Sequence, residues 1–431
     1  MECHFQIFVN DEWTDCATLS LRAGVGAGNV NNLGSVFEYD LDYAFGLTPE
    51  PVSLRFPVDA DRHLLARWPA FFYDLIPQGS GRKFLLGQLG LADGPQADFQ
   101  LVCAGAFNPI GRVRAREAVE YFHYHIQRHD AQGMDRGFSM DEIVERGEAF
   151  HERMMIHSML AAGTTGVQGA APKYLLTVDR QGLWHADGAL SDQDAGSHFI
   201  VKRPRGNSAA DKKVLKNEAA YMRVAAAMGI RTHGMLRHHD DMLFIPRFDR
   251  LVADGKVLRL HQESAASLAG LVGFDARPSQ FALLGALRAV VTDKTGDTIE
   301  FLKRDVLNLA MRNTDNHARN TAVQKIGAEV RLTPLFDFAP MYLDPEGISR
   351  AARWYDPGTG KELTVWGDVI RALELQAGEA DRITLALYRF GAELKGLDGH
   401  MQEAGVDADI IAYLQANIVE QIRQLSLLGE K

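Results

Sequence analysis

The sequence has few cysteines, no long apolar run and no excess of basic residues. Its three cysteines, Cys3, Cys16 and Cys103, lack a CxxC pair or the Cys/His spacing of zinc sites. We therefore expect reduced thiols and no structural zinc. No apolar stretch approaches the roughly 18–20 residues that cross a bilayer, and the first residues lack the basic and apolar segments of a signal peptide. These absences predict a cytoplasmic protein that does not bind a membrane.

The charge balance is acidic. The chain has 46 basic and 56 acidic residues, a formal net charge of −10, so the protein as a whole is not suited to coating nucleic acid. Its hydrophobic content of 46% is ordinary for a globular protein, and 431 residues are enough for two or three domains.

The apolar pattern changes along the chain and predicts three domains. Residues 1–120 form a β-rich subdomain, 121–255 a domain with a glycine-rich loop and a buried hinge strand, and 256–431 a helical lobe. Strands are expected at 5–9, 17–22, 36–39, 52–56, 174–178, 322–323 and 330–332. Helices are expected at 64–75, 81–91, 97–103, 140–159, 217–228, 262–271, 279–292, 298–312, 363–374, 379–395 and 407–428. Segments 115–145 and 207–216 are interpreted as a linker and a polar loop.

The most informative stretch is 313–320, which contains one acid, three amides, a histidine and an arginine, with the strand-like segment 332–337 behind it. An aspartate, an asparagine five residues later and a second aspartate after a short strand pair are what phosphoryl transfer needs. Asp315 would orient the hydroxyl nucleophile, while Asn320 and Asp337 would hold Mg²⁺. A polar loop with an Asn-Asp turn and helix caps is the alternative interpretation.

Residues upstream supply the other parts of a nucleotide site. The glycine-rich loop 163–169 could cradle phosphates, or be a plain turn. Lys202 ends an apolar strand, where lysines pair with phosphates but are also commonly solvated. Glu218 could pair with Lys202 or favour the dipole of its helix. Strand 243–250 could offer backbone groups to adenine, or be a core strand that ends in a surface Asp249–Arg250 pair.

The order of these parts is that of a two-lobed kinase. No His-Arg-Asp or Asp-Phe-Gly triplet is present, although Asp337-Phe338-Ala339 comes near to the second. With these motifs the sequence resembles the HipA family of bacterial serine/threonine kinases, the toxins of HipA/HipB toxin–antitoxin systems. The segments that carry the resemblance are 71–79, 105–111, 198–204, 217–218, 246–250, 314–320 and 332–337.

The resemblance implies an α+β, two-lobed protein-kinase-like fold with an N-terminal β-rich subdomain and a helical C-terminal lobe. It implies ATP and Mg²⁺ as cofactors, with Asp315 catalytic and Asn320 and Asp337 as magnesium ligands. The further nucleotide-site residues that it implies are Gly166, Val167, Gln168, Gly169, Lys173 and Lys202 near the phosphates, Pro246 and Phe248 at adenine, and His317 supporting the loop.

The implied partners are a HipB-like DNA-binding antitoxin, through which DNA is mainly contacted, and a protein substrate, characteristically an aminoacyl-tRNA synthetase. One position departs from the family pattern. Gly166 stands where the best-known members carry an autophosphorylated serine, and Thr164 and Thr165 are the nearest hydroxyls. A small-molecule phosphotransferase and a non-catalytic partner of the antitoxin in transcriptional autoregulation are the alternative functions.

Overall fold

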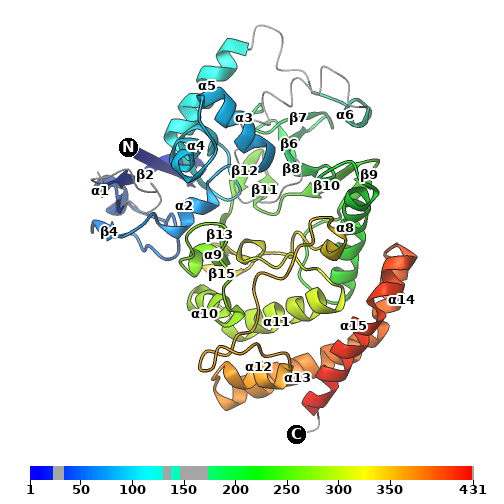
Figure 1. Ribbon diagram of the computed structural model, residues 1–431. Coiled ribbons are helices and arrows are strands. Elements are labelled where there is room, and N and C mark those ends of the chain that lie inside the picture. Colours follow the sequence, from blue (N-terminus) through cyan, green and yellow to red (C-terminus); the bar gives the residue numbers. More distant parts are fainter. Residues whose placement is uncertain (23–33, 130–136, 146–172, 430–431) are drawn as a thin grey trace. The chain divides into compact units, whose positions relative to one another are not determined.

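The computed structural model describes residues 1–22, 34–129, 137–145 and 173–429, shown in Figure 1. The chain divides into two compact units. The first comprises Met1–Arg203 with Phe244–Gly273, and the second comprises Pro204–Leu243 with Phe274–Lys431. Because the chain passes from the first unit to the second and back again, neither unit is one continuous segment. The finer division at 1–120, 121–255 and 256–431 stays a prediction.

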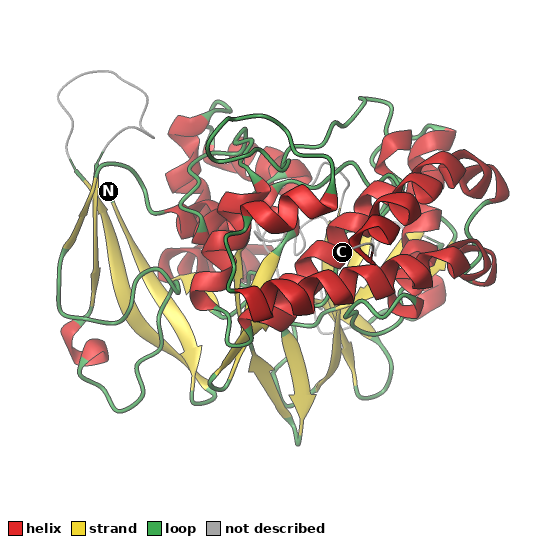
Figure 2. Cartoon of the chain, turned by 90° about the horizontal axis from the view of Figure 1, so that it is seen from below, coloured by secondary structure: helices red, strands yellow, loops and turns green. Residues whose placement is uncertain are grey.

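The first unit begins with an antiparallel sheet in the order β4-β3-β2-β1-β5. Its strands are β1 (Glu2–Val9), β2 (Glu12–Leu21), β3 (Ser35–Tyr39), β4 (His63–Leu65) and β5 (Val113–Ala115). They are the strands beside the N-terminus in Figure 2. In β1 the residues Cys3, Phe5 and Ile7 are fully buried, because alternate side chains of a strand point to one face. The sheet therefore has one apolar face, which short helices cover.

The helices of the first unit are α1 (Leu41–Ala44), α2 (Ala70–Asp74), α3 (Gly79–Leu89), the 3₁₀ turn η2 (Pro95–Ala97), α4 (Asp98–Gly105), α5 (Arg116–His129), α6 (Met140–Val144) and α9 (Ala265–Leu268). The rings of Phe5 and Phe71 lie 5.5 Å apart, and those of Phe72 and Phe99 lie 5.3 Å apart. These aromatic contacts join β1, α2 and α4 in one core.

Three predictions for this part of the chain were wrong. Segment 52–56 makes a single bridge, Ser53 with Phe56, and no strand. Segment 64–75 begins as a strand, and its helix starts only after Pro69, which has extended backbone. The expected linker 115–145 begins with the 14-residue helix α5. The expected helix 140–159 is present as α6, and its part beyond 145 lies outside the described residues.

A second sheet of the first unit carries the candidate lysines. It includes β6 (Lys173–Asp179), β7 (Trp184–Ala186), β8 (Ala195–Lys202) and β10 (Met242–Pro246), which are neighbours in the order β7-β6-β8-β10 of a five-stranded sheet. A hairpin of β11 (Arg250–Ala253) and β12 (Lys256–Arg259) follows, and then β13 (His261–Ser264). The expected helix 262–271 is thus a short strand followed by α9, which Ser264 caps by accepting a hydrogen bond from the Ser267 N–H.

The second unit is mainly helical, as predicted. Its helices are α8 (Ala209–Ala227), α10 (Gln280–Val290), α11 (Lys294–Ala310), α12 (Trp366–Ala372), α13 (Ala377–Glu393), α14 (Leu397–Glu403) and α15 (Ala408–Ser426). Short elements between them are β9 (Arg237–His239), η3 (Ala318–Asn320), β14 (Ala322–Ile326), β15 (Glu329–Leu332), η4 (Met341–Leu343), η5 (Leu394–Gly396) and η6 (Leu427–Gly429). Helix α11 packs against α13 and α15 through its apolar face.

Helix α8 corrects two further expectations. Segment 207–216 is not a loop, because a capping box of Ser208 and Asp211 starts the helix at Ala209. Glu218 is therefore in the middle of the helix, with 4% of its surface exposed, and does not act on the helix dipole. Its expected pairing with Lys202, a residue of the other unit, stays a prediction.

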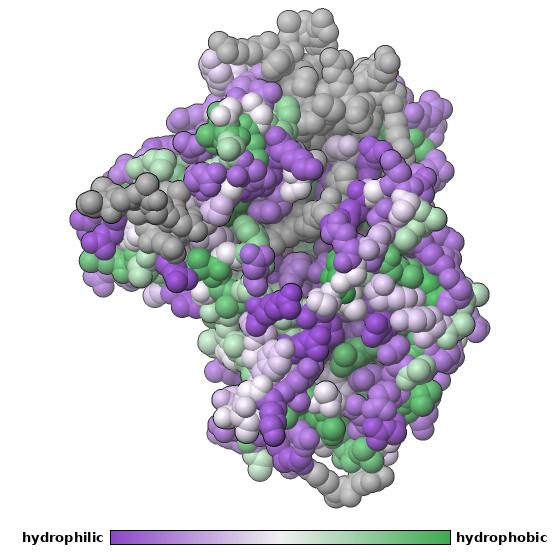
Figure 3. All heavy atoms as spheres, viewed as in Figure 1, coloured by the Kyte–Doolittle hydropathy of each residue, from purple (hydrophilic) through white to green (hydrophobic). Residues whose placement is uncertain are grey.

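Hydrophilic and apolar side chains are mixed over the face seen in Figure 3. Within the described ranges, every helix is too short or too polar to cross a bilayer.

Candidate active site

The polar segment 313–320 begins where the buried helix α11 ends. Met311, at the C-cap, is fully buried, and its carbonyl accepts a hydrogen bond of 3.1 Å from the Tyr221 hydroxyl. The next residue, Arg312, has a left-handed backbone with φ of 54°. This conformation commonly ends helices and redirects the chain. The helix end therefore holds the start of the segment against the core.

Two asparagines fix the segment in place. The Asn313 Nδ2 donates to Asn308 Oδ1 at 3.0 Å. Asn316 binds the backbone of a distant segment: its Nδ2 donates to the Ala352 carbonyl at 2.7 Å, and its Oδ1 accepts from the Ala351 N–H at 2.9 Å. Both side chains are buried and hydrogen-bonded within the protein, so these amides shape the loop.

The remaining amide, Asn320, is oriented by the candidate catalytic residue. Its Nδ2 donates to the Asp315 backbone carbonyl at 2.8 Å, and its N–H donates to the His317 carbonyl at 2.9 Å. With Nδ2 committed, Oδ1 is the amide atom available to a cation. His317 Nε2 lies 3.6 Å from Asp315 Oδ1, which is an electrostatic contact rather than a hydrogen bond. His317 supports the loop mainly through its backbone.

Asp337 follows the β14–β15 hairpin, and two hydrogen bonds hold the backbone of the residues just before it. Arg304 Nη2 donates to the Thr333 carbonyl at 2.7 Å, and the Leu335 N–H donates to the Arg231 carbonyl at 2.7 Å. Asp337 itself has φ of 56°, a left-handed conformation that aspartate tolerates better than most residues. Such conformations persist where the surroundings enforce them, and they cluster at functional sites.

One pocket of the second unit brings the predicted catalytic and magnesium residues together. Asp315, Asn320 and Asp337 all line it. The other lining residues are Gln280, Leu283, Phe301, Arg304, Asp305, Asn308, Asn313, Asn316, Thr321, Leu335 and Phe336. We call this pocket the acidic pocket, after Asp315 and Asp337. The pocket offers carboxylate and amide oxygens, the ligand types that Mg²⁺ takes in proteins.

Asp305 is a further acid of the pocket that the sequence did not single out. It is 2% exposed, accepts from Trp354 Nε1 at 2.9 Å and pairs with Arg350 Nη2 at 2.7 Å. Arg304 beside it pairs with Glu300 Oε1 at 2.8 Å, and burial lowers the pKa of its guanidinium despite that pairing. These inner charges are neutralised within the protein, so they serve the structure of the pocket.

The two candidate lysines of the first unit are neighbours. Lys173 and Lys202 are register partners of the antiparallel strands β6 and β8, and Lys202 is only 5% exposed. Residues directly opposite each other in such a pair have side chains on the same face. The predicted loop residues Gly166, Val167, Gln168 and Gly169, with Thr164 and Thr165, lie outside the described residues.

The residues of the predicted hinge strand differ in how deeply they are buried. Pro246 and Phe248 are half-buried, whereas Arg247 between them is 3% exposed and its N–H donates to the His198 carbonyl at 2.9 Å. Asp249 and Arg250 are buried as well. The alternative interpretation of a surface Asp249–Arg250 pair was therefore wrong.

These residues form a buried network, which we call the arginine–aspartate cluster: Asp187, Arg247, Asp249 and Arg250. Arg247 donates to Asp187 and Asp249 at 2.8 Å each, and Arg250 donates to Asp249 at 2.6 Å. Burial alone would raise the pKa of Asp249, but the guanidiniums of Arg247 and Arg250 outweigh it and hold that pKa well below its usual range. The Gly111 N–H also donates to Asp249, at 2.8 Å. The cluster joins segment 108–111 to the strand end.

The fold of the chain is similar to that of a protein of known structure. The chain aligns with a solved structure described as the Shewanella oneidensis MR-1 toxin–antitoxin system HipA, HipB and its operator DNA complex. The match has a TM-score of 0.63 and 18% identity and covers 99% of this chain and 98% of the other. The fold is accordingly α+β and of the two-lobed, protein-kinase-like class.

The family follows from the sequence models. Residues 165–393 match the HipA-like C-terminal domain, and residues 22–116 match the HipA N-terminal domain. The chain belongs to the HipA family. A structure of the Helicobacter pylori proinflammatory kinase CtkA matches with a TM-score of 0.38 and 11% identity over 54% of this chain and 89% of the other, which is too distant for any inference. Curated proteins yield no significant sequence match.

Proposed function

We propose that the chain is an ATP-dependent protein serine/threonine kinase of the HipA toxin type. It transfers the γ-phosphate to a Ser or Thr of a protein target, for which the family resemblance points to an aminoacyl-tRNA synthetase, and so inhibits translation and growth. The observation that carries the proposal is that Asp315 and Asn320 of one loop and Asp337, which follows the β14–β15 hairpin, line one pocket. Two carboxylates and an amide around one pocket are the polar set of a phosphoryl-transfer site.

The donor set fits a magnesium ion. The Asp337 carboxylate and the Asn320 Oδ1 would hold it, since the Nδ2 of Asn320 is already used by the Asp315 carbonyl. A magnesium ion held by these residues would supply positive charge that offsets the negative charge of the phosphates. Buried pairs such as Arg350–Asp305 keep the inner acid from competing for the ion.

Asp315 is the proposed catalytic residue for the hydroxyl nucleophile. Its side chain is 24% exposed, so a substrate Ser or Thr can approach it, and its carboxylate would orient that hydroxyl and accept its proton. Lys173 and Lys202, opposite each other across β6 and β8, would balance the phosphate charge. The convergence of these lysines with the pocket, and the contacts of Pro246 and Phe248 with adenine, stay predictions.

The partner is proposed from the family and the solved complex. The similar Shewanella structure is described as containing HipA, HipB and operator DNA, and this chain matches it over nearly its whole length. We propose a HipB-like DNA-binding antitoxin as the partner, with DNA contacted mainly through it. The net charge of −10 favours this indirect contact, because an acidic chain repels phosphate. The proposed location is the cytoplasm.

The test compares the wild-type chain with Asp315→Asn. Each is expressed under control, and phosphate transfer from γ-labelled ATP is followed in protein and metabolite fractions, with phosphoproteomics to identify the target. We expect labelled protein and growth arrest only with wild type. Asp368→Asn, which alters a surface pair with Arg371, is the matched control and should behave as wild type. Protein labelling by Asp315→Asn would overturn the catalytic assignment, and label confined to metabolites would overturn the protein-kinase proposal.

A further inference from the structure

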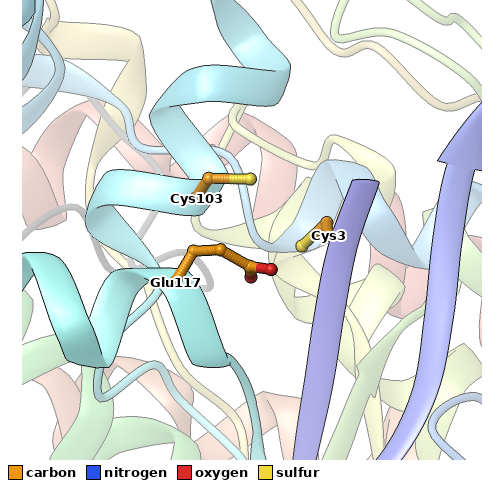
Figure 4. A group of neighbouring side chains, drawn as sticks. All are labelled: Cys3, Cys103 and Glu117. Carbon is orange, nitrogen blue, oxygen red and sulfur yellow. The ribbon is translucent and has the colours of Figure 1, made fainter. Parts of the chain in front are cut away.

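Three side chains from distant parts of the first unit converge beside the N-terminal strand. Figure 4 shows Cys3 of β1, Cys103 of α4 and Glu117 of α5 directed toward one another. Both sulfur atoms and a carboxylate oxygen lie within 4.8 Å of one another. None of these residues belongs to the pocket of the second unit, so the group has no role in the proposed phosphoryl transfer.

The fold explains why these residues meet. Cys3 points to the buried face of β1 and is fully buried, since it alternates with Phe5 and Ile7 toward the core. Helix α4 covers this face and brings Cys103, which is half-buried. Glu117 lies in the first turn of α5, directly after the edge strand β5. The group therefore spans three elements that the core already holds in place.

The carboxylate is oriented by a second set of contacts. Glu117 accepts the His4 backbone N–H at 3.1 Å, and the His4 Nδ1 lies 2.5 Å from Glu117 Oε1. Carboxylate ligands of metal ions are typically held by hydrogen bonds of this kind, which fix their direction and raise their affinity. His4 and Glu117 are partly exposed, at 33% and 27%, which leaves an entry path for an ion.

We propose that Cys3, Cys103 and Glu117 form a binding site for a borderline-soft divalent cation of the zinc class. Two sulfurs and one oxygen are a ligand set that zinc accepts in tetrahedral geometry, with water in the fourth position. Their mutual separation is short enough for one ion to contact all three after small side-chain movements. His4 is a positioning residue that acts through Glu117.

Binding would cross-link β1, α4 and α5. Each thiol transfers its proton to solvent when the ion binds, and the ion then stabilises the folded first unit according to its occupancy. The site is expected to be structural, because all three ligands come from the chain's core elements and the pocket of the second unit contributes none of them.

The test uses the full chain with its thiols kept reduced and with excess Mg²⁺ to occupy oxygen-only sites. Equilibrium dialysis with Zn²⁺ should give one ion per chain, and Cd²⁺ should produce the ultraviolet charge-transfer band of metal–thiolate bonds. Cys103→Ser should weaken Zn²⁺ binding by at least about tenfold and reduce the band, and Glu117→Gln should weaken binding while keeping the band.

The matched control is Cys16→Ser. Cys16 of β2 is as fully buried as Cys3 but lies outside the group, so its replacement, in protein that circular dichroism shows to be folded, should leave both stoichiometry and band unchanged. His4→Ala should keep the band and lower affinity less than Glu117→Gln does. Because Cys3→Ser removes a fully buried thiol and can unfold the sheet, the half-buried Cys103 carries the test, with circular dichroism to verify folding. Unchanged Zn²⁺ binding in folded Cys103→Ser, or no thiolate band in wild type, would overturn the proposal.

Discussion

Aspartates have different surroundings in two polar regions of the molecule, the arginine–aspartate cluster and the acidic pocket. In the arginine–aspartate cluster of the first unit, the side chains of Arg247 and Asp249 are 0% and 2% exposed. In the acidic pocket of the second unit, the Asp315 side chain is 24% exposed. Both regions contain aspartates close to other polar groups, and in the cluster Asp249 is enclosed together with the two guanidiniums that pair with it.

The difference lies in where the hydrogen bonds are used. Asp249 accepts from Arg247 Nε at 2.9 Å, from Arg250 Nη1 at 2.6 Å and from the Gly111 N–H at 2.8 Å, so its lone pairs are taken by the protein. In the pocket, Asn320 instead uses its Nδ2 on a backbone carbonyl and keeps Oδ1 for a ligand. A buried, internally satisfied network stabilises and specifies a fold, whereas a partly exposed acidic set is suited to a cation.

The largest expected effect is on the cluster. Asp249→Asn leaves the buried Arg247 and Arg250 with too little countercharge and should reduce the free energy of unfolding by about 3–5 kcal/mol. Urea denaturation measures it. The control is Asp192→Asn, which removes the partly exposed pair with Arg259 and should change stability by no more than about 1 kcal/mol. Equal losses of stability in Asp249→Asn and Asp192→Asn would show that the buried cluster contributes no more than a partly exposed ion pair.

Asp337→Asn should affect phosphate transfer strongly and stability little. The loss of a magnesium ligand should lower phosphate transfer by about 10²–10³-fold, because charge stabilisation at the phosphates is weakened. The unfolding transition should shift less than in Asp249→Asn, since Asp337 is only half-buried. Part of the activity should return at high Mg²⁺ concentration. A loss of stability as large as that of Asp249→Asn would contradict this picture.

Asn316→Ala should reduce both stability and phosphate transfer, each by an amount between those expected for Asp249→Asn and Asp337→Asn. It leaves the Ala351 N–H and the Ala352 carbonyl without their partner and should reduce stability by about 1–3 kcal/mol. Because the loop that carries Asp315 loosens, phosphate transfer should fall as well. The comparison of Asn316→Ala with Asn316→Asp, which keeps the acceptor for Ala351, separates the two hydrogen bonds. An activity loss without any stability loss would argue that Asn316 contacts the substrate.

The smallest effect concerns pH. Asp187 and Asp249 have pKa values held well below the usual carboxyl range by Arg247 and Arg250, although burial opposes this. Their contribution to stability is therefore complete above the unfolded-state pKa of about 4 and declines as the pH falls toward the folded-state values. Urea denaturation at falling pH should show stability decreasing below pH ~4, less steeply in Asp249→Asn. An increase in stability as the pH falls over this range would contradict the lowered pKa values of Asp187 and Asp249.

Local patterns predicted many of the elements. The alternation in β1 and the helical spacing of α10, α11, α13 and α15 were visible in the sequence, because burial on one face requires them. The start of α8 was missed because its first turns are polar, although Ser208 and Asp211 are the residues that cap it. The strand expected at 52–56 was wrong, since an apolar run cannot show whether a neighbouring strand is available to pair with it.

The candidate site was predictable as far as its members are close in sequence. Asp315 and Asn320 lie in one loop, and a short hairpin returns the chain to Asp337. The supporting contacts were not visible: Asn316 binds residues 35 and 36 positions away, and Asp305 binds Trp354. Such contacts depend on the packing of separate segments, which a local pattern does not encode.

The sequence by itself determined the residue types of the acidic pocket, their order along the chain and the helical character of the second unit. Only the tertiary structure decided that Asp249 and Arg250 are buried and that Cys3 and Cys103 lie together, although their spacing resembles no metal motif. The physical reason is that burial and the meeting of distant side chains arise from the packing of whole elements. Residue type and short-range spacing establish what chemistry is available, and packing decides which groups share a site.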